Sequence, residues 1–193
     1  KTLPGAQTVP TRIDKLYRET LRYRVPPQAE RWCSKAPSNI QNIPQILNYF
    51  NNEVRFIHLV RDVRDVVLSK HPKDKSSFWV QPERWLHDVK AGWEYYHHPS
   101  VHTIRYEDLI LDYKATIRKL CEFIGVDMTP EMLNWHENTG IKKSSAVFGE
   151  IGSFFKSSIG KWKAPEHQAY IEEIMAQPEI AVMLRNYGYT PQA

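Results

Sequence analysis

Residues 54–70 read VRFIHLVRDVRDVVLSK, and they predict the central element of the fold. The segment starts with a short apolar run that includes β-branched residues (Phe56, Ile57, Leu59 and Val60), which is typical of a strand buried on both faces of a parallel sheet. Charged residues follow at 61–65, and an apolar pattern resumes at 66–68 as a helix would. Ligands of open α/β sheets bind beyond the carboxyl ends of the strands, so we expect a ligand at 61–65.

The charged turn has two interpretations. In the simpler one, Arg61 and Asp65 form an ion pair at helical spacing, which contributes only about 0.2–0.5 kcal/mol. In the other, Arg61 and Ser69, which lies eight residues further on, supply a guanidinium fork and a hydroxyl that suit a phosphate group. The residues of the turn alone leave both interpretations open.

The spacing of Arg61 and Ser69 resembles the 3′-phosphate-binding segment of sulfotransferases that use 3′-phosphoadenosine 5′-phosphosulfate (PAPS). In that family an arginine ends a strand and a serine follows eight positions later. The resemblance implies that Arg61 and Ser69 bind the 3′-phosphate. Further segments of the chain are similar to the same family and occur in the same order.

One of these segments precedes the central strand. Ser38 and Gln41 form a capping-box pattern, and it predicts a helix with one apolar side, made by Ile40, Ile43, Ile46, Leu47 and Phe50. Lys35 then lies in the loop before that helix, where a lysine is ordinarily just solvated. The loop resembles the W-x-x-K-x-P stretch of many sulfotransferases, with Trp32, Lys35 and Pro37 in register. The resemblance implies a catalytic Lys35, close to the transferred sulfuryl group.

A second strand and helix are predicted after residues 61–70, which we call the junction because they connect the first strand to the following helix. Residues 101–106 form a short apolar strand, and the following helix is expected to be capped by Asp112 and to end at Gly125. The sequence Tyr-Glu-Asp at 106–108 resembles the family segment in which the tyrosine, here Tyr106, lies near the adenine ring. By the same resemblance Thr139 and Ile141 flank the adenine, with isoleucine in place of the family's phenylalanine.

The segment FFKSSIGKWK at 154–163 concentrates lysines and small residues. Small residues let backbone N–H groups approach an anion and lysines add charge, although a basic surface loop has the same composition. The segment is similar to the family's C-terminal nucleotide-binding loop, with Gly160, Trp162 and Lys163 in register. Phe155 and Ser157 replace an arginine and a glycine of that pattern. The resemblance therefore implies nucleotide contacts from Lys156, Ser157, Ser158 and Gly160.

Other segments predict scaffold. An irregular arm is expected over 1–12, and helices over 14–23, 82–97, 130–137, 165–175 and 179–187. Trp85 and Trp93 are interpreted as core residues of the 82–97 helix rather than as a stacking surface for an acceptor. The polar segment after the junction, 71–81, is interpreted as a mobile loop near the ligand.

Composition limits the class of protein. The chain has 193 residues, 41% of them hydrophobic and 25% charged, which predicts a single domain over 1–193 of a soluble globular protein. A net charge of +4 suits an anionic ligand. No apolar run is long enough to span a membrane, and the N-terminus has no signal-peptide core, so a cytoplasmic location is expected. Cys33 and Cys121 are expected to be free thiols, and no metal site is expected.

Together the resemblance implies a three-layer α/β/α domain with a mostly parallel sheet, of nucleotide-kinase-like architecture. It implies transfer of a sulfuryl group from PAPS to a hydroxyl or amine of a small molecule or polymer, leaving 3′-phosphoadenosine 5′-phosphate. The family's N-terminal glycine-rich loop, which holds the 5′-phosphosulfate, has no match in residues 1–193. We therefore expect that this chain is part of a longer enzyme.

Two other interpretations stay open. One is a catalytically inactive module that binds PAPS or its product. The other is a basic nucleic-acid-binding protein, but the positive residues occur in short clusters rather than in a long stripe with interleaved aromatic residues. Neither a catalytic base nor the acceptor can be chosen from the sequence.

Overall fold

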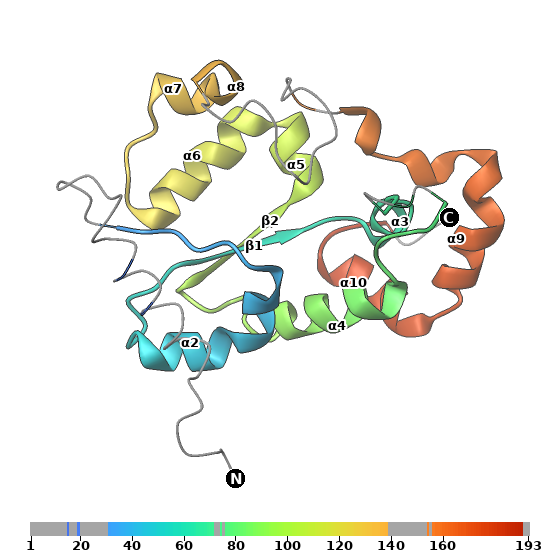
Figure 1. Cartoon of the computed structure of the whole chain (residues 1–193), viewed down its shortest axis with the longest axis horizontal. Coiled ribbons are helices and arrows are strands. Elements are labelled where there is room, and N and C mark those ends of the chain that lie inside the picture. Colours follow the sequence, from blue (N-terminus) through green and yellow to red (C-terminus); the bar gives the residue numbers. More distant parts are fainter. Residues whose placement is uncertain are drawn as a thin grey trace, which may run out of the picture.

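The computed structural model describes residues 15, 19, 31–71, 74, 76–138, 154 and 156–190. At its centre lie two parallel strands, β1 (Phe56–Val60) and β2 (Val101–Arg105). Helices α5 (Tyr106–Leu111) and α6 (Tyr113–Ile124) lie on one side of the strands, and α2 (Ile43–Tyr49) and α4 (Pro82–Trp93) lie on the other (Figure 1). The predicted α/β class and the order of its three layers are confirmed.

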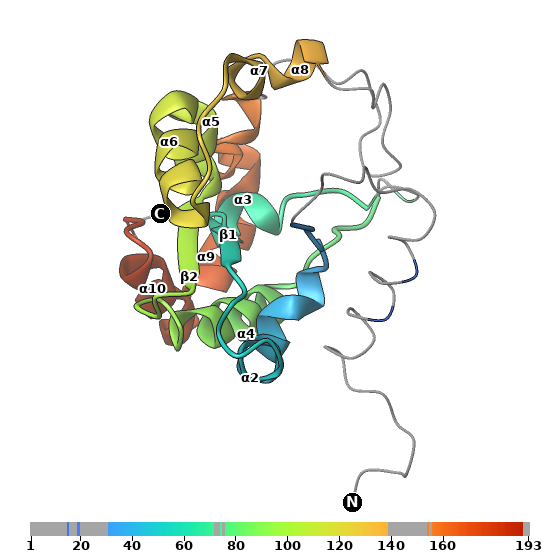
Figure 2. The same cartoon turned by 90° about the vertical axis from the view of Figure 1, so that its left-hand side faces the viewer.

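The remaining elements are short helices and a C-terminal helical pair. A single turn, α3 (Val63–Val66), follows β1, and α7 (Pro130–Leu133) and α8 (Trp135–Asn138) follow α6. The pair α9 (Gln168–Met175) and α10 (Pro178–Asn186) packs beside α4 (Figure 2). Four 3₁₀ turns complete the described chain: η1 (Pro37–Asn42), η2 (Lys156–Ser158), η3 (Lys161–Lys163) and η4 (Pro165–His167).

Strand register aligns the two predicted ligand-facing segments. Phe56 pairs with Val101 and Val60 pairs with Arg105, so the strands end level with each other. Arg61 follows the end of β1 and Tyr106 follows the end of β2, at the same edge of the sheet. The connection between the strands passes through α4, as expected for parallel strands, which need a long crossover.

The main core lies between the junction, α4 and the C-terminal helices. It contains Val60, Val63 and Val67 together with Trp85, Val89, Ile171, Ile174, Ile180 and Leu184. Trp85 is buried in this cluster and Trp93 packs against it, so the interpretation of both tryptophans as core residues is confirmed. Burying side chains of this size contributes roughly 1.5–3 kcal/mol each, which fixes α3 at the end of β1.

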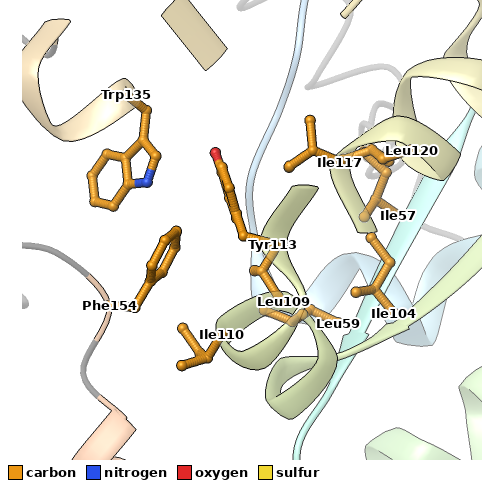
Figure 3. A pocket seen from close by; sticks show the side chains of 10 residues that line it. All are labelled: Ile57, Leu59, Ile104, Leu109, Ile110, Tyr113, Ile117, Leu120, Trp135 and Phe154. Carbon is orange, nitrogen blue, oxygen red and sulfur yellow. The ribbon is translucent and has the colours of Figure 1, made fainter. Parts of the chain in front are cut away.

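One prediction about β1 is wrong. The strand was expected to be buried on both faces, but Ile57 is 45% exposed and Leu59 is 52% exposed. Both side chains line an open apolar pocket of about 440 Å³ whose walls come from β1, β2, α5, α6, α8 and Phe154 (Figure 3). In the described part of the chain, helices cover this face of the sheet without filling the space above β1.

Helix boundaries and caps differ from the predictions in several places. The capping box at Ser38 is wrong, because the first turns are the 3₁₀ segment η1 and the Gln41 amide donates to Asp88 Oδ1 at 2.7 Å. The 82–97 helix ends at Trp93, and the 130–137 helix is broken into α7 and α8 at Asn134. Asp112 precedes α6, but its side chain makes no capping hydrogen bond. The predicted glycine cap is confirmed, since Gly125 ends α6 with φ of 68°.

Other expectations concern the described residues only in part. Of the predicted 14–23 helix, Lys15 and Glu19 are described, and both are helical. Cys33 is exposed and Cys121 is buried, and both are free thiols. Across the described ranges, no helix is long and apolar enough to cross a membrane, and no group of His, Cys, Asp or Glu side chains is arranged to hold a metal ion.

Candidate functional site

Three residues that the sequence analysis selected from separate segments meet at one edge of the sheet. The Arg61 guanidinium lies over the Tyr106 ring, 4.7 Å from the ring centroid. Arg61 Nη2 donates to the Ser158 carbonyl oxygen, and the hydroxyls of Tyr106 and Ser158 are 2.9 Å apart. We call Arg61, Tyr106 and Ser158 the arginine cluster.

Arg61 keeps donor capacity in this arrangement. Its Nε atom is buried and has no hydrogen-bond partner among the described residues, which is uncommon for a buried donor and calls for an explanation. The Arg61 backbone is fixed from the opposite side, because Trp85 Nε1 donates to the Arg61 carbonyl oxygen at 2.9 Å. The arginine is thus held at its backbone while its guanidinium keeps an unused N–H group.

A buried ion pair in the turn joins residues other than those of the simpler interpretation. Arg64, which is 3% exposed, pairs with Asp62 at 2.7 Å, and its guanidinium lies 3.8 Å from the Trp162 ring centroid. Asp62 Oδ1 also accepts from the Arg64 backbone N–H at 2.9 Å, which caps α3. The expected ion pair of Arg61 with Asp65 is replaced by contacts of both residues with 158–162.

Asp65 is a residue of the site that the sequence analysis did not select. Its side chain accepts from the backbone N–H groups of Gly160, at 2.7 Å, and Trp162, at 3.3 Å. The only sequence signal was an acidic residue within the charged turn. Its partners lie 95 and 97 residues away, so local spacing could not identify them.

Glu107 is a second carboxylate that was missed. Its Oε1 accepts from the Asp62 backbone N–H at 3.1 Å, and its Oε2 accepts from the Tyr189 hydroxyl at 2.6 Å. Burial, and then the neighbouring Glu107 carboxylate, raise the pKa of Tyr189 above its usual range, so this hydroxyl stays a donor. Glu107 therefore joins the start of α5 to the end of β1 and to the C-terminal segment.

The other selected residues lie at varying places. Ser69 is half-buried at the end of the junction, where its hydroxyl faces the Asp65 carbonyl oxygen at 3.5 Å. Lys156 and Ser157 are exposed on η2, and Gly160 precedes η3. Lys35 is exposed in the segment before η1, where it forms no hydrogen bond or ion pair with another described residue. Thr139 and Ile141 lie outside the described residues.

The arginine cluster suits an anionic ligand that carries a planar ring. It combines a guanidinium whose Nε has no partner among the described residues, two hydroxyls and the aromatic ring of Tyr106. The apolar pocket of Figure 3 has a different character, because the ten described residues that line it are aliphatic or aromatic and none is charged. Charged groups are therefore expected to bind at the cluster and not in that pocket.

Comparison with known proteins gives a consistent result. A family model described as "Sulfotransferase family" matches residues 6–130. Rat sulfotransferase 2A1 is 25% identical over 146 residues, covering 59% of this chain and 51% of the rat protein. Guinea pig 3-alpha-hydroxysteroid sulfotransferase is 24% identical over 102 residues, covering 44% of this chain and 36% of its own length. The chain spans about half the length of the rat and mouse sulfotransferases 2A1 that it matches.

Proposed function

The chain belongs to the sulfotransferase family, and on this premise we propose that it binds PAPS at the arginine cluster and serves in transfer of its sulfuryl group. Arg61 and Ser69 bind the 3′-phosphate in this proposal. Tyr106 lies beside the adenine ring, with Thr139 and Ile141 nearby. Lys156, Ser157 and Ser158 complete the nucleotide contacts, while Gly160, expected to join them, donates its N–H to Asp65.

One observation supports this proposal most strongly. No described residue pairs with the buried Arg61 Nε donor, although the same guanidinium already contacts Tyr106 and Ser158. A buried guanidinium N–H is costly to leave unpaired, and a phosphate oxygen is a strong acceptor for it. Binding of the 3′-phosphate would satisfy this donor.

The reaction needs little covalent chemistry from the protein. PAPS supplies the sulfuryl group, whose bond to the phosphate oxygen breaks while a bond to the acceptor oxygen or nitrogen forms. The acceptor loses a proton to a base, which the sequence does not identify. Lys35 places a positive charge next to the oxygens that gain negative charge, so catalysis rests on positioning and electrostatics.

The acceptor in this proposal is a hydroxyl or amine of a small molecule or polymer. The guinea pig relative is named for a hydroxysteroid, which is an alcohol, and this agrees with a hydroxyl acceptor. We keep a cytoplasmic location in the proposal, because an exposed free thiol such as Cys33 is typical of a reducing compartment.

A second candidate function is a module that binds the nucleotide without transferring sulfate. The exposed position of Lys35 favours it, since Lys35 makes no hydrogen bond or ion pair with a described residue of the arginine cluster. In that case the full-length protein would bind 3′-phosphoadenosine 5′-phosphate and show no transfer to phenol, alcohol or amine acceptors.

The test compares two nucleotides that differ in one phosphate. Titration calorimetry on the full-length protein should show that adenosine 3′,5′-bisphosphate binds much more tightly than adenosine 5′-monophosphate. Arg61→Ala should weaken bisphosphate binding roughly ten- to a hundred-fold, as expected for loss of a charged hydrogen bond, and Ser69→Ala should weaken it less. Monophosphate binding should barely change in either variant.

Arg84→Ala is the matched control, because Arg84 is an exposed arginine on α4 that pairs with Asp88. It should leave both affinities unchanged. Equal affinity for the two nucleotides, or an equal effect of Arg61→Ala on both, would contradict a 3′-phosphate site at Arg61.

A further inference from the structure

We propose that Asp65 is the positioning residue of the nucleotide site, holding residues 156–163 against the junction so that Ser158 reaches Arg61 and Tyr106. This inference rests on the proposed function and extends it to a residue that contacts no nucleotide. Its basis is the position of a buried carboxylate between two segments that lie far apart in the sequence.

The Asp65 carboxylate is directed at backbone groups of residues 156–163, which we call the loop. Asp65 is 2% exposed, and each of its two oxygens accepts from a different N–H group, Oδ2 from Gly160 and Oδ1 from Trp162. A carboxylate this deeply buried is stable when several donors satisfy it. The backbone N–H groups of Gly160 and Trp162 supply those donors, so the docked loop compensates the burial of the Asp65 carboxylate.

The loop conformation fits this role. Gly160 has φ of 76°, a left-handed conformation that favours glycine, and it precedes η3 without a capping side chain of its own. Asp65 supplies the missing acceptor from another part of the chain. It thereby stabilises the bend between Ser158 and Trp162.

The junction contacts the loop through three side chains. Arg61 donates to Ser158, Arg64 stacks on Trp162, and Asp65 accepts from both Gly160 and Trp162. Of these, only the Asp65 contacts fix the loop backbone at two points. Since Ser158 lies two residues before Gly160, fixing Gly160 sets where the Ser158 hydroxyl meets Tyr106.

This changes the role expected for Gly160. Its N–H was expected to approach the nucleotide, but the structure gives that N–H to Asp65. One alternative predicts the opposite effect of Asp65 on nucleotide affinity. In this alternative Asp65 occupies backbone N–H groups that a phosphate would otherwise bind, so the carboxylate competes with the nucleotide. Removing the carboxylate weakens nucleotide binding if Asp65 positions the loop and strengthens it if Asp65 competes.

The experiment uses Asp65→Asn and Asp65→Ala in the full-length protein. Hydrogen exchange measured by mass spectrometry on peptides covering 156–163 should be faster in both variants without nucleotide, and fastest in Asp65→Ala. Binding of adenosine 3′,5′-bisphosphate should weaken about ten-fold or more in Asp65→Ala and less in Asp65→Asn, which keeps one acceptor oxygen. Binding of adenosine 5′-monophosphate should change less than that of the bisphosphate.

Asp108→Asn is the control. It also removes one negative charge, two residues from Tyr106 in the sequence, but Asp108 pairs with Arg105. It should leave exchange in 156–163 unchanged. Tighter bisphosphate binding in Asp65→Ala, or unchanged exchange in the loop, would overturn the positioning role. If the unmodified protein binds neither nucleotide, the proposed function fails, while the exchange data still decide whether Asp65 orders the loop.

Discussion

Arg64 and Arg84 show how differently two arginine and aspartate pairs contribute to stability. Arg64 and Asp62 are both buried, so removing one charge leaves the other unpaired in the interior, which costs about 3–5 kcal/mol. Arg84 and Asp88 form an exposed pair on α4, and such pairs contribute about 0–1 kcal/mol. The two pairs have similar geometry, and burial is what separates them.

Arg64→Ala should therefore lower the free energy of unfolding by about 3 kcal/mol or more, partly through loss of its contact with Trp162. Arg84→Ala should lower it by less than about 1 kcal/mol. Urea unfolding of the two variants measures both values. Similar losses in the two variants would show that Arg64 does not depend on its buried partner.

A substitution at Lys35 can test its proposed catalytic role without also changing the stability of the protein. Because its side chain makes no hydrogen bond or ion pair with a described residue, Lys35→Ala should leave the melting temperature unchanged. If Lys35 stabilises charge on the sulfuryl group, turnover of the full-length enzyme should fall about 100-fold, with a much smaller change in nucleotide affinity. Lys114→Ala, an exposed lysine on α6, is the control. Equal losses of turnover and affinity would assign Lys35 to nucleotide binding instead.

At the scale of single residues, the sequence predicts which residues form the arginine cluster better than it predicts the contacts that position them. Arg61 and Tyr106 each follow a short apolar strand, and the carboxyl ends of parallel strands meet at one sheet edge, so their proximity follows from pattern. Asp65 has only local neighbours in the sequence, and these suggested an ion pair with Arg61. Its real partners are backbone N–H groups, which no side-chain pattern marks.

At the scale of elements, the packing of α4 on β1 depends on one missing side chain. A Cβ atom added at Gly92 would lie 2.2 Å from Cε1 of His58, so the imidazole occupies the space that a larger residue would need. His58 also meets the Tyr187 ring edge-on at 5.9 Å, which limits its movement. Gly92 thus lets α4 approach the strand closely.

Gly92→Ala should destabilise the protein by about 1–3 kcal/mol, the range for overpacking, although alanine is ordinarily favoured over glycine inside a helix. Combining it with His58→Ala should remove most of that penalty, because the smaller residue leaves room for the new methyl group. Thermal unfolding of the two single variants and the double variant measures this coupling. Additive losses would contradict the close contact.

Element boundaries were predictable where backbone geometry dictates them and failed where a distant side chain intervened. Gly125 ends α6 in a left-handed conformation, which a glycine after an apolar helical pattern indicates. The capping box before α2 failed because Gln41 has a partner on α4, Asp88, that competes for its amide. Burial of β1 was overestimated because apolar character alone does not show which neighbour covers it.

At the scale of the whole molecule, His58 is expected to link stability to pH. Burial lowers the pKa of His58 from 6.5 to about 4, and the nearby Asp88 only partly opposes this shift. The folded state therefore favours the neutral imidazole, while the unfolded state takes up a proton below pH 6.5. The contribution of neutral His58 to the free energy of unfolding is fully present above pH 6.5 and is lost as pH falls toward 4.

This single group should remove about 3 kcal/mol of unfolding free energy between pH 7 and pH 4. His58→Leu, which cannot titrate, should show a flatter pH dependence over that range. His102→Gln is the control, since His102 is less buried and its pKa is lowered less far. Denaturant unfolding at several pH values measures the slopes, and equal slopes for the unmodified protein and His58→Leu would contradict this account.

The contacts between the junction and the loop also have a consequence for how the chain folds. Asp65 meets Gly160 and Arg61 meets Ser158 across 95 and 97 residues, so closing this part of the chain costs about 4 kcal/mol of loop entropy. The strands and α4 join residues that are closer in sequence, and they can form first. We therefore expect the contacts of Arg61 and Asp65 with residues 156–163 to form late in folding, and to be among the first to open when the native protein fluctuates. A nucleotide that bridges Arg61 and Ser158 would therefore stabilise the contacts that form last and make their opening less frequent.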